Sequence, residues 1–205
     1  MQWWLGFVLG FFILVDSAAA QVTLIPEHTP KPDYPSELFR KGVTGDVRIA
    51  FTAHADGSVS EVRALENSHP QLAGAALAAV SQWRFRPWTV DSDNPAVVEV
   101  VAPMVFRLDL DLPIHFNKSV NKWRCRDFNE EALRYPESSW VDMPVFNYTR
   151  GYLSNVFHTT QLPEAERLAL IARLNRSVPY IVRQCSTSPT SRYVRFLPEE
   201  IRKLL

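Results

Sequence analysis

The sequence predicts an α+β fold, in which a three-stranded antiparallel sheet with helices on one face is followed by a small, mainly helical region. Three observations lead to this prediction. Residues 45–67 alternate apolar and polar side chains around an Asp-Gly turn, which is the pattern of a hairpin. Residues 70–83 carry apolar side chains at helical spacing. Beyond Pro113 the periodicity is broken and arginine becomes more frequent, so the two-layer arrangement is expected to end there.

The chain begins with an apolar run, Trp3 to Val15, followed by three alanines at positions 18–20. The run is shorter than the roughly 20 residues that a helix needs to cross a bilayer. Small residues behind such a run are typical of a signal-peptide cleavage site. We therefore predict a signal peptide at residues 1–20 and a soluble exported protein. An uncleaved anchor is the alternative, because no Lys or Arg precedes the run.

Two short elements should precede the hairpin. Residues 21–33 contain several prolines and are predicted to be an extended linker. A helix is expected next, since Pro35 suits the first helical position and Gly42 suits the residue that ends a helix. In the hairpin itself, Val59 and Val62 are three residues apart, which indicates a bulge or a change of register on the return strand.

The helix at residues 70–83 is rich in alanine, so it should lie close against the sheet. Trp83 is expected to close this helix, Phe85 to turn inward, and Pro87 to redirect the chain, while the two intervening arginines face outward. A ligand-stacking platform is the alternative for this aromatic segment. The last strand should run from Val97 to Leu108, and the proline inside it indicates an edge strand or a bulge.

Residues 113–205 are predicted to be mainly helical. The strongest pattern lies at residues 162–177, where Arg173 and Arg176 should lie near the helix end. Shorter helices are expected at 127–135, 144–157 and 197–205. The two cysteines of an exported chain favour one disulfide, between Cys125 and Cys185. Two free thiols or a redox pair are the alternatives, although no Cys-x-x-Cys is present.

Composition argues against several classes of function. The 22 basic residues are balanced by 22 acidic ones, so no global field attracts nucleic acid. The five histidines show no metal-ligand spacing, and no Gly-x-Ser-x-Gly or phosphate-binding glycine loop occurs. We therefore expect no cofactor, no metal and no catalysis.

Marker residues, taken in order, resemble the C-terminal domain of TonB-family proteins over residues 34–112. The residues that carry the resemblance are Tyr34, Pro35, Gly45, Phe51, Asp56, Gly57, Trp83, Phe85, Pro87 and the strand end at 105–108. The resemblance implies a periplasmic protein of TonB-dependent transport, in which the domain binds the TonB box of an outer-membrane receptor as an added strand. The residues expected to bind the partner are Val97, Val98, Glu99, Val100, Val101, Ala102, Met104, Val105, Phe106, Arg107 and Tyr34, with residues 29–34 as a secondary contact.

Three departures from the family pattern leave other functions open. The N-terminus is expected to be cleaved, whereas a force-transmitting TonB protein keeps an N-terminal anchor. About 14 residues lead from the cleavage site to Tyr34, which at ~3.4 Å each reach on the order of 50 Å, less than the gap between the two membranes. The region at 113–205 also has no counterpart in the simplest family members. The alternatives are therefore a stand-alone periplasmic adaptor that binds peptides without the inner-membrane motor, or an enzyme of unknown class.

Overall fold

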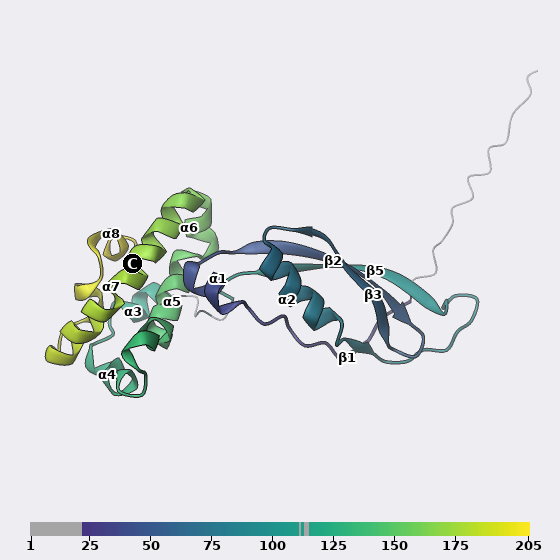
Figure 1. Cartoon of the computed structure of the whole chain (residues 1–205), viewed down its shortest axis with the longest axis horizontal. Coiled ribbons are helices and arrows are strands. Elements are labelled where there is room, and N and C mark those ends of the chain that lie inside the picture. Colours follow the sequence, from purple (N-terminus) through teal and green to yellow (C-terminus); the bar gives the residue numbers. More distant parts are fainter. Residues whose placement is uncertain (1–21, 111, 113–114) are drawn as a thin grey trace, which may run out of the picture.

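The structure is a computed structural model that describes residues 22–110, 112 and 115–205. The predicted signal peptide therefore lies outside the described residues. The molecule is elongated, with a sheet region at one end and a helical region at the other (Figure 1). The sheet has the order β3-β2-β5, and both pairs are antiparallel. Its strands are β2 (Gly45–His54), β3 (Val59–Asn67) and β5 (Val97–Phe106). The predicted α+β fold is confirmed.

The hairpin between β2 and β3 forms at the predicted turn. The Asp56 carboxylate accepts a hydrogen bond from the Ser58 N–H at 2.9 Å, and Gly57 has a φ of 84° that favours glycine. A side chain on Gly57 would also collide with the Phe85 carbonyl, which lies 2.0 Å from the Cβ position. The expected irregularity on the return strand is a bulge at Glu61, which has a φ of 51°.

Two helices flank the sheet, α1 (Ser36–Lys41) and α2 (Pro70–Val80). Small side chains let α2 lie against β2 and β3 (Figure 1), and Leu72 and Val80 enter a core that contains Ile49 and Phe51. α2 ends at Val80, three residues earlier than the sequence predicted. The chain then forms a turn, in which the Trp83 N–H donates to the Val80 carbonyl at 2.9 Å.

Part of the segment at 21–33 that was predicted to be a linker belongs to a second, two-stranded sheet. Its strands are β1 (Pro26–His28) and β4 (Arg84–Phe85). The Trp83 indole N–H adds a bond to the Pro30 carbonyl at 3.0 Å, so this extended segment is held on the domain and does not hang free. Phe85 is buried and its ring stacks against Phe51, while Arg84 and Arg86 are exposed; the predicted packing role is observed.

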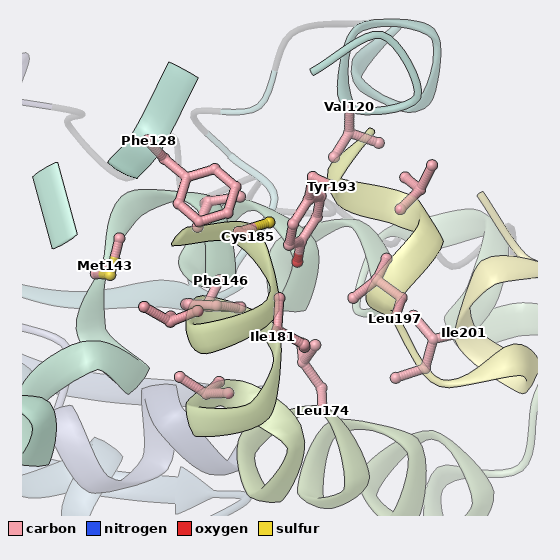
Figure 2. Packing of buried hydrophobic residues seen from close by; sticks show 14 of the residues in the cluster. Val120, Phe128, Met143, Phe146, Leu174, Ile181, Cys185, Tyr193, Leu197 and Ile201 are labelled. Atoms are coloured by element: carbon pink, nitrogen blue, oxygen red, sulfur yellow. The ribbon is translucent and has the colours of Figure 1, made fainter. Parts of the chain in front are cut away.

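The helical region surrounds a second hydrophobic core (Figure 2). Its elements are α3 (Phe116–Val120), α4 (Arg126–Ala132), the 3-10 helix η1 (Glu137–Asp142), α5 (Pro144–Leu153), α6 (Val156–Gln161), α7 (Glu164–Thr187), the 3-10 helix η2 (Tyr193–Phe196) and α8 (Glu199–Arg202). A disulfide between Cys125 and Cys185 joins the start of α4 to the last turn of α7.

Two of the predicted helices have different lengths. The helix expected at 162–177 continues through Pro179 to Thr187, so Arg173 and Arg176 lie mid-helix and not near its end. An interior proline costs about 3 kcal/mol, but apolar side chains remain buried on both sides of Pro179 and offset that cost. The element expected at 144–157 is two helices, because Asn155 caps α6 by accepting a hydrogen bond from His158 N–H at 2.9 Å.

Side chains of α7 hold the end of α1. The buried Arg167 guanidinium donates to the Gly42 carbonyl at 2.6 Å, and Asn175 Nδ2 donates to the Arg40 carbonyl at 2.7 Å. These bonds satisfy carbonyls that a helix end leaves unpaired. Arg150 of α5 is also buried; burial lowers its pKa to about 10. Its guanidinium lies 5.9 Å from the centre of the Phe39 ring.

Substituting Gly42 with alanine should therefore loosen the contact between α1 and α7. Gly42 has a φ of 75°, and an added Cβ would lie 2.2 Å from Ile171 Cδ1. The left-handed backbone and the overpacking together should lower the free energy of unfolding by about 3 kcal/mol. The control is Gly74→Ala, where a Cβ meets nothing within 4 Å and a gain of about 0.5–1 kcal/mol is expected in a helix. Denaturant unfolding measures the free energy of unfolding of the parent and of both variants. A Gly42→Ala variant as stable as Gly74→Ala would contradict this packing.

Candidate peptide-binding edge

β5 is an edge strand of the three-stranded sheet. It pairs with β2 in unbroken register from Phe106 opposite Gly45 to Val97 opposite His54. In the part of the chain that the structure describes, no strand pairs with its other side. The edge position that Pro103 predicted is thus confirmed. β5 is two residues shorter than predicted, because its pairing with β2 ends at Phe106 opposite Gly45. Leu108 lies beyond this end and is buried, with its carbonyl against Gly151 of α5.

Backbone hydrogen bonds show which groups of β5 face outward. The Ala55 N–H donates to the Ala96 carbonyl at 2.9 Å, at the next position of the β2–β5 register. N–H and C=O of one residue point to the same side of a strand, and successive residues alternate. The even-numbered residues of β5 therefore bond to β2. The residues whose backbone groups point away from the sheet are Val97, Glu99, Val101, Pro103 and Val105.

The opposite side of β2 gives the same alternation. The Asp46 carbonyl accepts from Ser68 N–H at 3.0 Å, and the His54 N–H donates to the Ser58 carbonyl at 2.9 Å. Even-numbered residues of β2 thus face β3, and the odd-numbered ones are left to face β5. Since odd residues of β2 lie opposite even residues of β5, the outward direction of the odd residues of β5 is established twice.

Side chains of β5 divide between two faces. The even residues, from Val98 to Phe106, are buried or half-buried on the side of α2. On the opposite face Val97, Val101 and Val105 are 52%, 46% and 56% exposed. An added strand would therefore place its side chains alternately beside the core and beside this exposed row of valines.

The other edge of the sheet offers a poorer template. The pairing of β3 with β2 shifts register twice, between Arg48 and Ile49 and between Ala50 and Thr52. Bulges twist a strand and interrupt its row of free backbone groups. β5 has no such shift along its ten residues, so it is the straighter of the two edges.

Tyr34 and Arg107, both predicted to bind a partner, have partners within the chain. The Tyr34 hydroxyl donates to the Val43 carbonyl, and its ring packs edge-on against Phe106 with 5.5 Å between centroids. Burial raises the Tyr34 pKa to about 12, against the opposing effect of Arg167. Arg107 follows β5, and its guanidinium makes two bonds to the Asp109 carboxylate, at 2.9 and 2.6 Å.

Among the described residues, no group of three or more His, Cys, Asp or Glu side chains is placed to hold a metal ion. Within the same residues, no helix has the length and apolar character needed to cross a membrane.

Comparison with known proteins identifies the sheet region. Residues 30–108 match the family described as Gram-negative bacterial TonB protein C-terminal. Protein TonB from two strains of Xanthomonas campestris pv. campestris is 32% identical over 91 residues, which cover 44% of this chain. The match spans 40% of the length of these relatives.

Solved structures of the same family are also similar. The solution structure of the Pseudomonas aeruginosa TonB C-terminal domain is 21% identical, with a TM-score of 0.35 over 45% of this chain and 90% of that one. The tonb2 protein from Vibrio anguillarum is 20% identical, with a TM-score of 0.34 over 52% of this chain and 95% of that one. The family match and the curated relatives show that residues 30–108 of this chain are a TonB C-terminal domain.

Proposed function

We propose that the protein binds a partner peptide by strand addition to β5 and serves TonB-dependent transport across the outer membrane. The unpaired edge is the observation that carries this proposal: the outward N–H and C=O groups, in unbroken register, are what an added strand needs. The proposed location is the periplasm, and the proposed role is non-enzymatic. The partner is a peptide of an outer-membrane receptor.

The recognition we propose is centred on Glu99 and Val101. Their outward N–H groups belong to the longest uninterrupted row of donors on the edge, which runs from Val97 to Val101. Pro103, which has no N–H, ends this row. Main-chain bonds there would supply affinity, and apolar side chains of the partner beside Val97 and Val101 would supply selectivity. Tyr34, held by its own bond to Val43, would shape the end of the site by supporting Phe106.

The second candidate function is a periplasmic adaptor that binds peptides without the inner-membrane motor. The helical region favours it, since this region lies outside the matched residues 30–108 and has a hydrophobic core of its own. We propose on this ground that residues 34–112 and 113–205 are two domains. The bonds from Arg167 and Asn175 to the end of α1 would then fix the second domain to the first, close to where β5 ends at Phe106.

Site-specific crosslinking in cells that produce the protein separates these functions. A photoreactive residue at Val101 on the edge is compared with one at Leu65 on β3, which is similarly exposed. Capture of an outer-membrane receptor only from position 101 supports the transport function. Capture of a periplasmic protein from that position supports the adaptor. Equal capture from both positions, or none from position 101, contradicts strand addition at β5.

A further inference from the structure

The free edge of β5 has one interruption in its row of donors. Pro103 lies opposite Arg48 and is one of the residues whose backbone points outward. Because the nitrogen faces away from β2, the missing N–H costs the sheet no hydrogen bond. It removes a donor only from the outer edge, between Val101 and Val105. The proline therefore leaves the hydrogen bonds of the protein's own sheet intact. It removes one hydrogen bond from the pairing with any added strand.

The same edge is suited to pairing with a second copy of this chain. It is ten residues long and without a register shift, and Glu99 is its single charged residue. Val97, Val101 and Val105 beside it are about half exposed. Straight, apolar, unpaired edges join edge to edge unless a proline, a charge or a bulge prevents it.

We propose that Pro103 determines specificity at this edge by discriminating against a second copy of the chain in favour of a foreign strand. When two copies pair through β5, each contributes one missing donor, so the dimer lacks two hydrogen bonds. A foreign strand that pairs with β5 lacks one. A net hydrogen bond changes an equilibrium constant by about two- to tenfold, so Pro103 weakens self-association by the square of its effect on a foreign strand. The part of this inference that concerns foreign peptides rests on the proposed function.

Restoring the donor tests the inference. Pro103→Val in the full chain supplies an outward N–H in a residue that favours strands. We expect its self-association constant, measured by analytical ultracentrifugation, to rise by about four- to a hundredfold over the parent. Pro103→Ala restores the same N–H with little added apolar surface and should show the same direction, which covers the case that the valine variant does not fold.

A composition-matched control separates the donor from the side chain. The double variant Val101→Pro with Pro103→Val has the parent's residues in exchanged positions and keeps one missing donor per copy. It should remain as monomeric as the parent, although it carries valine at position 103. The proposal would be overturned if the double variant self-associated as strongly as Pro103→Val. It would also be overturned if Pro103→Val and Pro103→Ala both self-associated no more strongly than the parent.

The foreign-strand arm uses a synthetic TonB-box peptide of an outer-membrane receptor. Its affinity should rise about two- to tenfold in Pro103→Val, less than self-association does. If the peptide binds no variant while self-association still follows the donor at position 103, the proposed function fails and the role of Pro103 in self-association stands. A larger gain for the peptide than for self-association would overturn the discrimination.

Discussion

Replacing Val101 with proline is expected to weaken peptide binding at least tenfold while the fold survives. The Val101 N–H faces outward, so the substitution removes an edge donor without breaking a bond to β2. Val101 is 46% exposed, which leaves room for the ring. With Pro103 already present, two adjacent donors would be absent, and the ring would stand where a carbonyl of the partner strand approaches.

The measurement is the affinity of a TonB-box peptide for the parent and for Val101→Pro, with circular dichroism as the test of folding. Val101→Thr is the matched control, because threonine keeps the N–H, the β-branch and nearly the same volume at an exposed position. Its affinity should stay within about twofold of the parent, a change smaller than one net hydrogen bond. Equal weakening in both variants would assign binding to the valine side chain and not to the backbone edge.

Removing the disulfide should have the largest effect on stability. Cys125 and Cys185 are 60 residues apart, and closing a loop of that length restricts the unfolded chain by about 4 kcal/mol. Both cysteines are buried in the core of the helical region, and Figure 2 shows Cys185 near Phe128 and Tyr193. The double variant Cys125→Ala, Cys185→Ala should therefore lose about 4 kcal/mol in the unfolding of the helical region.

Denaturant unfolding followed by far-ultraviolet circular dichroism measures this loss, because the helices dominate that signal. The parent under reducing conditions is the matched comparison, since it keeps both cysteine side chains and loses only the bond. The sheet region, with its own core around Ile49 and Leu72, should keep its stability. A loss below about 1 kcal/mol in both cases would show that the crosslink does not constrain the unfolded chain as the loop model requires.

The sheet region could be predicted where a local rule fixes the backbone. The Asp56-Gly57 turn determined the hairpin, the alanines predicted α2, and Pro103 indicated an edge. The short strands β1 and β4 were missed, because segments of two or three residues have no periodicity to recognise. The two segments are also joined by a side-chain bond, from the Trp83 indole N–H to the Pro30 carbonyl.

The helical region shows a different limit. The helix was expected to end at residue 177, yet α7 continues through Pro179 because its buried stripe extends through Ile181 to Cys185. Arg150 and Arg167 are buried, whereas arginine in a sequence is expected at the surface. Their carbonyl and amide partners belong to distant segments, as with Gly42 and Asn175. Such pairs depend on tertiary packing, and no sequence spacing marks them.

The candidate edge lies between these cases. The family resemblance predicted that the strand Val97–Leu108 binds a partner. The sequence did not show which N–H groups of β5 are free, because that depends on the register with β2. The register is fixed by pairing over the full length of both strands. It makes every second residue of β5 available and places Pro103 among them.

Amide hydrogen exchange, resolved by residue in the protein with and without a TonB-box peptide, tests the central claim most directly. Strand addition to β5 predicts that the N–H groups of Glu99 and Val101 become protected on binding. The N–H groups of Val100 and Ala102, which already bond to β2, should change little. Protection that does not alternate along β5, or that appears on β3 in its place, would contradict strand addition at this edge.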